Sequence, residues 1–428
     1  MVKIIKADGK AEVEFLAAMR ERGRQTNKSV TEAVTEILDN VREKGDAAVR
    51  EYTMKFDKKC PDIFEVDREV INDALTEADE QFVSALLNAQ ENIAAFHNKQ
   101  KTQSFIDAQP NGVIMGQRVR GLKRVGIYVP GGTAAYPSSV MMNAIPAKIA
   151  GVEEIIMVTP PAEGGKPNPD ILAAAAICGV DRVFLMGGAQ AIAAMAYGTE
   201  SVPKVDKIVG PGNIFVATAK KLLYGTVDID MVAGPSEIMI IADETANPKF
   251  LAADMMGQAE HDKLASAILL TTSMKIAEET NAEIERQIAE MPRREIIEAS
   301  FANYGAIIVC ESEEQMIMLS EELAPEHLEV QVKDPMRLLG RLDNVGSLFL
   351  GEYSPEPLGD YYAGPNHVLP TSGTARFFSP LGVDSFVKRS AYICYNKQAM
   401  IEAADDIVEI AGREGLYAHA NAIKVRLD

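Results

Sequence analysis

Apolar positions recur along this chain with two different periods. In residues 29–55 and 71–99 they return every three or four positions, which is the spacing of one face of a helix. From residue 125 onward, short runs rich in β-branched residues alternate with alanine-rich segments of helical composition. Strands that alternate with helices in this way indicate βαβ units and a parallel sheet.

The alternation predicts two α/β units in tandem. For the first unit we predict strands at 125–129, 154–158, 182–186 and 207–209, with helices that begin near Ser138, Asn168, Ala189 and Asn213. For the second unit we predict strands at 236–242, 265–272, 305–309, 327–332 and 345–351, with helices over 247–261 and up to about residue 290. Residues 351–380 interrupt the alternation with five of the 21 prolines, and a loop of this length is usually functional. From Ser390 onward the pattern predicts a helical tail that could dock elsewhere.

Composition narrows the class of protein. The 428 residues are 47% hydrophobic and 25% charged, as in globular proteins, and the formal net charge is −19. This acidity argues against nucleic acid or an anionic membrane as a partner, because both require a surplus of Lys and Arg. No run reaches the ~18–20 apolar residues of a spanning helix, and the first ten residues lack the apolar centre of a signal peptide. We therefore expect a cytoplasmic protein whose four scattered cysteines are reduced and buried.

Glycines follow three of the predicted strands, at residues 131–132, 187–188 and 210–212. There the carboxyl ends of parallel strands meet helix N-termini, an edge at which α/β sheets bind ligands and anions. The dinucleotide fingerprint GxGxxG is absent, because the nearest match, GPGNIF (210–215), lacks its third glycine. Each turn alone is more readily interpreted as a tight βα connection, whereas three in succession favour a nucleotide site.

Two pairs of polar residues are candidates for chemistry. Gln258 and His261 lie three positions apart on a predicted helix, so both side chains share a face and could bind a metal. Taken alone, the pair is more readily interpreted as a helix-end histidine that interacts with the helix dipole. Glu326 precedes His327 just before a predicted strand, and adjacent residues of an extended chain point to opposite sides, which argues against a simple ion pair. Histidine suits a general base and the carboxylate could activate water, although two surface-loop residues would look the same.

The other histidines carry weaker signals. Asp360 and His367 lie seven positions apart in the proline-rich loop, a spacing that does not specify a metal site. His419, in the predicted tail, has only Glu414 as an acidic neighbour. His97 lies in the polar run HNKQK and is predicted to be a solvated position on a helix surface.

Taken together, these segments resemble histidinol dehydrogenases. The resemblance is carried by VGIYVPGG (125–132), GGAQAIAAMAYGT (187–199), KIVGPGN (207–213), AGPSEIMIIAD (233–243), GQAEHD (257–262), APEHLE (324–329), GDYYAGPNHVLPTSGTARF (359–377) and REGLYAHANA (413–422). It covers essentially the whole chain in order, and the set of motifs is highly specific.

The resemblance implies an α/β fold of two incomplete Rossmann-like parallel-sheet domains, with small helical extensions at both ends. The implied boundaries are 1–22 for the N-terminal extension, 23–127 with 238–380 for the domain of the zinc and catalytic residues, 128–237 for the domain that contacts NAD, and 381–428 for the tail. Members are homodimers with intertwined subunits, so we expect Glu414 and His419 to reach the partner's active site.

The resemblance also implies a role for each site residue. Glu326 and His327 would be catalytic, and the ligands of one zinc ion would be Gln258, His261, Asp360 and His419. The residues in contact with NAD would be Tyr128, Gln190 and Asn213. The substrate L-histidinol would be held by Ser236, Gln258, His261, His327, Asp360, His367, Glu414 and His419.

The implied activity is the oxidation of L-histidinol to L-histidine through bound L-histidinal, with two NAD per histidinol, in the last steps of histidine biosynthesis. His327 would take the hydroxyl proton as hydride leaves for NAD, Glu326 would then activate water on the aldehyde, and zinc would chiefly orient the substrate. Three alternatives are a relative that oxidises a sulfonated propanediol, a zinc-dependent hydrolase and a non-catalytic assembly protein. The retained Glu414 and His419 favour histidinol, the glycine turns count against the hydrolase, and the Glu326-His327 pair counts against a loss of catalysis.

Overall fold

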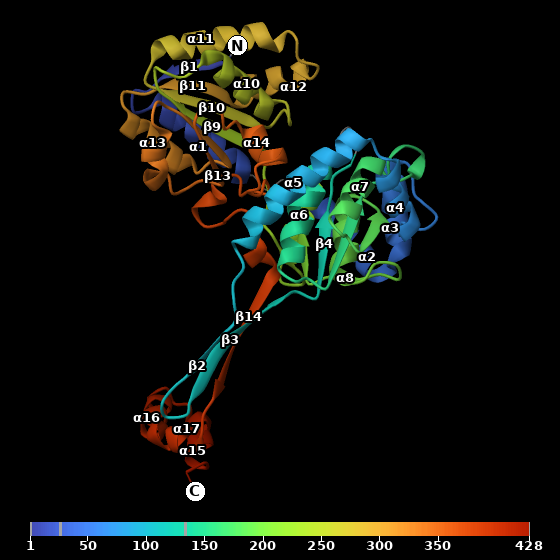
Figure 1. The fold of residues 1–428 in the computed structure, drawn as a ribbon, viewed down its shortest axis with the longest axis vertical. Helices are drawn as coiled ribbons and strands as arrows, with labels where there is room; N and C mark the ends of the chain where they lie inside the picture. Colours follow the sequence, from blue (N-terminus) through green and yellow to red (C-terminus); the bar gives the residue numbers. More distant parts are fainter. Residues whose placement is uncertain (1, 25–27, 132–134, 428) are drawn as a thin grey trace.

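The computed structural model describes residues 2–24, 28–131 and 135–427, in which two parallel β-sheets and an antiparallel arm are the main features (Figure 1). One sheet has six strands in the order β1-β11-β10-β9-β12-β13, and the other has five in the order β6-β5-β4-β7-β8. Every strand pairing within these two sheets is parallel. The predicted α/β class, with two parallel-sheet units, is confirmed.

The five-stranded unit follows the predicted alternation closely. Its strands are β4 (Arg124–Tyr128), β5 (Glu154–Thr159), β6 (Arg182–Leu185), β7 (Lys207–Val209) and β8 (Asp228–Ile229). The helices between them are α6 (Pro137–Ile149), α7 (Pro169–Ile177), α8 (Gly188–Tyr197) and α9 (Ile214–Leu223). Asn168 and Asn213 precede α7 and α9 as predicted, because each side-chain oxygen accepts two backbone N–H groups of the first turn.

Four N-terminal helices also cover the five-stranded sheet. They are α2 (Lys28–Lys44), α3 (Asp46–Asp57), α4 (Arg68–Glu77) and α5 (Glu80–Asn98). Helix α2 packs on α8 and α9, α4 packs on α7, and α5 packs on α6. The helix predicted over 29–55 is broken at Gly45, which has a φ of +53°. The helix predicted over 71–99 is broken at Ala78, where the backbone is extended.

The six-stranded unit is built around strands that are buried on both faces. Its strands are β1 (Lys3–Lys6), β9 (Glu237–Ala242), β10 (Ser266–Thr271), β11 (Gly305–Val309), β12 (His327–Gln331) and β13 (Ser347–Leu350). Its helices are α1 (Ala11–Arg24), α10 (Pro248–Ala259), α11 (Met274–Ile288), α12 (Arg294–Tyr304), α13 (Glu313–Leu323) and the short α14 (Glu356–Tyr361). Helices α10 to α12 share one apolar cluster with the sheet, and α1 and α13 share the other. Burial on both faces explains why the strands are nearly continuous apolar runs.

The sheets divide the chain differently from the expected boundaries in two places. Strand β1, within the expected N-terminal extension, is an edge strand of the six-stranded sheet. Helices α2 to α5 and strand β4 belong to the five-stranded unit, although residues 23–127 were expected to join 238–380. The apolar face of α2 is buried in the same cluster as the alanines of α8. An amphipathic pattern predicts that a face is buried but does not say against which sheet.

A long antiparallel arm separates the tail from both units (Figure 1). It consists of β2 (Phe105–Ala108), β3 (Ile114–Gly121) and β14 (Val387–Cys394), with β3 in the centre. Helices α15 (Lys397–Glu402), α16 (Ala404–Arg413) and α17 (Tyr417–Lys424) lie at its far end. The helical prediction from Ser390 was therefore wrong up to Cys394, where pairing with β3 keeps the chain extended, and right beyond it.

Two expectations about single residues were also wrong. His97 is fully buried rather than solvated, because the end of α5 lies beneath the loop that carries Asn366. Its Nδ1 lies 2.8 Å from the carbonyl oxygen of Ile93, and burial lowers the pKa of the ring. Of the cysteines, Cys394 is exposed on β14, whereas Cys178 is buried as expected. No helix in the described parts of the chain has the length and apolar composition to cross a membrane.

Candidate active site

A cavity of about 320 Å³, to which several ionisable side chains contribute, lies between the two sheet units. The five-stranded unit contributes the turn of residues 210–213, and the six-stranded unit contributes the residues around β9 and β12. Of the residues predicted to form the site, those that line the cavity are Asn213, Ser236, Gln258, His261, Glu326, His327, Asp360 and His367. The fold therefore brings together most of the predicted site from segments far apart in the sequence.

The two units face the cavity with opposite ends of their strands. In the five-stranded unit the cavity meets the carboxyl ends of β4 and β7, where the strand order reverses, and such a switch point is the usual ligand site of α/β sheets. In the six-stranded unit His327 is the first residue of β12 and pairs with Ile238 near the start of β9. Ser236, Glu326 and His327 thus lie at the amino ends of β9 and β12.

Glu326 and His327 are both buried and both contact the backbone of Glu237. An oxygen of Glu326 accepts the N–H of Glu237 at 2.9 Å, and Nδ1 of His327 lies 2.9 Å from the carbonyl oxygen of Glu237. Because a carbonyl oxygen only accepts, Nδ1 carries the proton and Nε2 is the basic nitrogen. Burial lowers the pKa of His327, so the ring is neutral and its contact with Glu326, 3.6 Å from Nδ1, is not an ion pair. The two side chains were expected to point to opposite sides, but they lie close together because Glu326 is in a bend before β12 and not on the strand.

Three side chains form a group with the spacing of metal ligands. Ligand atoms of His261, Glu356 and Asp360 lie within 4.8 Å of one another. Gln258 is fully buried, and neither polar atom of its amide has a hydrogen-bond partner in the described parts of the protein. Helix α10 ends at Ala259, so His261 follows it in a turn in which its N–H bonds to the carbonyl of Gln258. Gln258, His261 and Asp360 thus share the cavity as predicted, and Glu356 joins them.

Glu356 is the site residue that the sequence reasoning missed. It is 3% exposed and lines the cavity, and its Oε1 lies 3.9 Å from Nε2 of His327. Burial and the nearby charge of Asp360 raise the pKa of Glu356 to about 10. A helix at residues 356–361 would have placed it one turn before Asp360, but the prolines and glycines around it indicated a loop.

His367 and Ser236 line the same cavity from two loops. Nδ1 of His367 lies 3.1 Å from the carbonyl oxygen of Asp360 and 3.7 Å from its carboxylate. Burial lowers the pKa of His367, so its ring is also neutral. The loop of residues 351–380 is therefore part of the site, as its length indicated.

The residues expected to contact NAD are distributed over three strand ends. Tyr128 is buried at the end of β4, where its hydroxyl accepts the N–H of Gly188 at 3.1 Å and burial raises its pKa to about 12. Gln190 is fully buried, and neither atom of its amide has a hydrogen-bond partner in the described part of the chain. Asn213 caps α9 and is the member of this set that lines the cavity.

Glu414 and His419 do not reach the cavity within one chain. Glu414 directly follows α16, and His419 lies in α17 at the far end of the arm (Figure 1). The described residues that line the cavity come from the two sheet units. Their expected place in the partner's active site stays a prediction.

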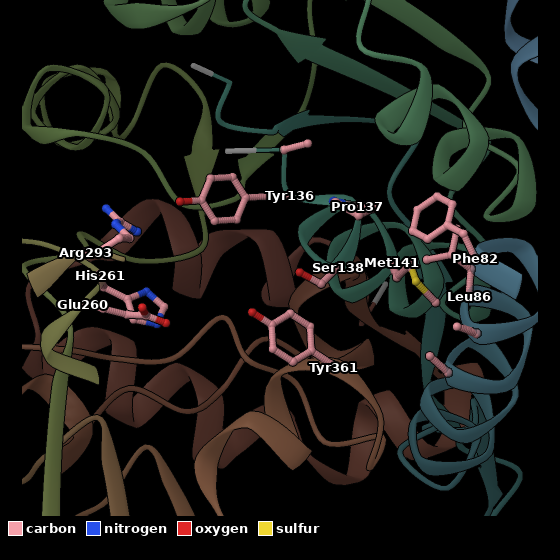
Figure 2. A pocket seen from close by; sticks show the side chains of 13 residues that line it. Phe82, Leu86, Tyr136, Pro137, Ser138, Met141, Glu260, His261, Arg293 and Tyr361 are labelled. Atoms are coloured by element: carbon pink, nitrogen blue, oxygen red, sulfur yellow. The ribbon is translucent and has the colours of Figure 1, made fainter. Parts of the chain in front are cut away.

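A second cavity of about 440 Å³ adjoins the first and shares Tyr136, Ser138, His261 and Tyr361 with it. Its apolar wall comes from α5 and α6, through residues such as Phe82, Leu86 and Met141 (Figure 2). In Figure 2 the hydroxyl groups of Tyr136 and Tyr361 point toward the polar side of the cavity, where Glu260, His261 and Arg293 lie. The candidate metal ligand His261 is therefore bordered by both cavities.

Comparisons with known proteins find relatives that match nearly the whole chain. A sequence model described as histidinol dehydrogenase matches residues 20–427. A histidinol dehydrogenase of Clostridium acetobutylicum is 55% identical over 427 residues, covering 100% of this chain and 99% of the relative. One of Listeria monocytogenes is 56% identical over 405 residues, covering 94% and 95%. The crystal structure of a histidinol dehydrogenase from Elizabethkingia anophelis matches with a TM-score of 0.93 at 37% identity, over 100% of this chain and 98% of that one. The chain therefore belongs to the histidinol dehydrogenase family.

Proposed function

We propose that this chain is a zinc-dependent, NAD-linked dehydrogenase that oxidises L-histidinol to L-histidine through L-histidinal. Family membership supports the proposal, and one observation carries it. In the described residues, Nε2 of His327 has no hydrogen-bond partner, and His327 lines the cavity that Gln258, His261 and Asp360 also line. A neutral imidazole in this position is suited to take the proton of a substrate alcohol.

The polar groups of the cavity fit one zinc ion. Zinc accepts imidazole nitrogen and carboxylate oxygen, and the buried amide of Gln258 lacks any other partner among the described residues. We propose Gln258, His261 and Asp360 of one subunit and His419 of the other as its ligands. Zinc bound there would supply a Lewis acid that helps to orient the substrate.

The first oxidation depends on His327. The carbonyl of Glu237 keeps the proton on Nδ1, so Nε2 accepts the proton of the substrate hydroxyl while hydride leaves the carbon for NAD. Burial keeps the ring neutral before the reaction. The products of this step are L-histidinal, NADH and a protonated His327.

The second oxidation depends on Glu326. The N–H of Glu237 holds its carboxylate in place, where it takes a proton from a water molecule that adds to the aldehyde carbon. The hydrated aldehyde then loses hydride to a second NAD and becomes the carboxylate of L-histidine. As water adds, His327 returns the proton of the first step to the aldehyde oxygen, so it can accept a hydroxyl proton again when hydride leaves; the protons left on His327, Glu326 and the carboxylic acid pass to solvent.

The five-stranded unit provides the proposed NAD site. Gly210 has a φ of +110° and its Cα lies so near the carbonyl of Tyr128 that a Cβ would approach the oxygen to 2.2 Å. This close approach shapes the turn of residues 210–212 at the switch point of the sheet. Among the described residues the buried amide of Gln190 has no hydrogen-bond partner, and Tyr128 supports the turn at Gly188.

The arm supports a homodimer with shared active sites. It carries α17 away from the cavity of its own chain (Figure 1). Large apolar side chains are exposed along the arm and tail, including Ile106 at 72%, Ile393 at 74% and Tyr417 at 74%. A second copy of the chain that covers these residues would also receive Glu414 and His419 in its cavity.

The activity is tested by NADH formation from purified protein and L-histidinol. We expect two NADH per L-histidine formed, loss of activity after removal of zinc by a chelator, and recovery when zinc is returned. A sulfonated propanediol offered in parallel should give no NADH. Zinc-loaded protein that forms no NADH from L-histidinol would refute the proposal.

Shared active sites are tested by mixing two inactive variants, His327→Asn and His419→Asn, under conditions that exchange subunits. If the tail acts on the partner, each mixed dimer holds one intact site and one doubly defective site. Half of the dimers are then mixed, so activity should return to about a quarter of that of the wild-type protein. If the tail acts on its own chain, no intact site forms and no activity returns.

A further inference from the structure

A buried polar cluster next to the candidate zinc ligands has no part in the proposed chemistry. It consists of Asp254 on α10 with Glu329 and Gln331 on β12. Glu329 is 1% exposed and Gln331 is 3% exposed. Burial of such groups is costly unless they are hydrogen-bonded, so their contacts indicate what the cluster holds together.

Every member of the cluster is linked to another element of the site. One oxygen of Glu329 accepts the N–H of Glu356 at 2.8 Å, and the other accepts the amide of Gln331 at 2.9 Å. The same amide donates to Asp254 at 2.7 Å, and the carboxyl groups of Asp254 and Glu329 lie close enough to influence each other's pKa. The cluster thus joins α10, β12 and the first residue of α14.

Each of these three elements carries a residue of the proposed site. Asp254 lies one helical turn before Gln258, on the same face of α10. Glu329 lies two positions after His327, on the same side of β12. Glu356 begins α14, and Asp360 follows one turn later. A shift in any one element would therefore move its site residue relative to the other two.

We infer that Asp254, Glu329 and Gln331 are positioning residues that set the spacing of the zinc ligands Gln258, His261 and Asp360. This inference rests on the zinc site proposed above. Partners that orient metal ligands from outside typically contribute 10–100-fold to metal affinity. Glu329 is the central member, because it contacts both other side chains and the start of α14.

The test compares two substitutions of Glu329. Glu329→Met removes the acceptors for the N–H of Glu356 and the amide of Gln331. Glu329→Gln keeps an oxygen for the N–H of Glu356 and loses only the acceptor for Gln331, while its new amide can donate to Asp254. Zinc affinity is measured by competition with a chromophoric chelator, and the melting temperature is measured for the metal-free proteins. We expect Glu329→Met to bind zinc about 10–100-fold more weakly and Glu329→Gln to stay within about threefold of the wild-type protein.

Glu12→Met is a matched control. Glu12 is also 1% exposed and accepts the N–H groups of Asp8 and Gly9 at 3.0 and 2.8 Å, but it packs beside β1 at the opposite edge of the sheet. We expect this variant to lower the melting temperature without changing zinc affinity. If Glu329→Met does not fold, Gln331→Met replaces it, with the same expected loss of affinity.

Two results would overturn the inference, and they are distinguishable. If wild-type protein takes up zinc and the tested variant binds it within about threefold, the cluster has only a structural role. If the wild-type protein takes up no zinc, the proposed function itself fails and the inference fails with it.

Discussion

Lys220→Met should destabilise the five-stranded unit and weaken the binding of NAD. The Nζ of Lys220 forms a buried ion pair with Asp230, in which the two side chains are 3% and 1% exposed. It also donates to the carbonyl of Gly210 at 2.9 Å, and Asp230 accepts the N–H of Gly210 at 2.8 Å. The pair therefore holds both backbone groups of Gly210, at the start of the turn proposed to contact NAD.

The expected loss follows from the charge that remains. Methionine has a similar length and no charge, so the variant leaves Asp230 buried without its counter-ion. Removal of one partner of a buried ion pair costs about 3–5 kcal/mol. Asp230 keeps the N–H groups of Gly210 and Met231, the latter at 2.6 Å, and these stabilise its charge. We therefore expect a loss near the lower limit, about 3 kcal/mol.

The assay is urea unfolding followed by circular dichroism, together with the KM for NAD at saturating L-histidinol. Lys221→Met is the control, because the neighbouring Lys221 is exposed and should change stability by less than about 0.5 kcal/mol. If Lys220→Met unfolds within about 1 kcal/mol of this control and the KM for NAD is unchanged, the role assigned to the ion pair is wrong.

Three further predictions concern other residues. His327→Asn should slow the oxidation of L-histidinol, whereas Glu326→Gln should mainly slow the oxidation of supplied L-histidinal; if both variants lose only zinc, the assigned roles are wrong. Burial lowers the pKa of His97 from its ordinary 6.5, so the unfolded chain binds more protons below this pH. The free energy of unfolding should therefore fall as pH drops from 6.5 toward the folded-state pKa, and His97→Gln should show a smaller fall. If urea unfolding gives the same dependence of this free energy on pH for both proteins, the prediction is wrong. Gly210→Ala should lower the melting temperature and raise the KM for NAD, because its Cβ would lie 2.2 Å from the carbonyl oxygen of Tyr128. If neither the melting temperature nor the KM changes, the close approach at Gly210 does not shape the turn as proposed.

Most regular elements could be predicted because their local pattern reflects burial. Strands β5, β9 and β10 are apolar runs covered on both faces, and such runs are recognisable without knowledge of the fold. Helix starts at Asn168 and Asn213 were predicted correctly, because a cap is a contact within one turn. Strand β14 was missed, because its eight residues are mostly exposed and depend on pairing with β3 for their conformation.

The site could be predicted only in part. Glu326 and His327 adjoin in the sequence, and the structure brings both to the backbone of Glu237. Glu356 gave no signal, because its role depends on a short helix that meets β12 and α10 in space. His97 was misread for a related reason, since its polar neighbours along the chain do not show that a distant loop covers it.

The sequence by itself determined the alternation of strands and helices, the glycine turns and the motifs that place the chain in its family. These features depend on neighbours along the chain or on the period of apolar positions. The tertiary structure alone decided which sheet each amphipathic helix covers, that Glu356 and Glu329 lie beside the proposed zinc ligands, and that the arm carries His419 away from its own cavity. Contacts of this kind join segments far apart in the chain, and they follow from packing of whole elements rather than from any local pattern.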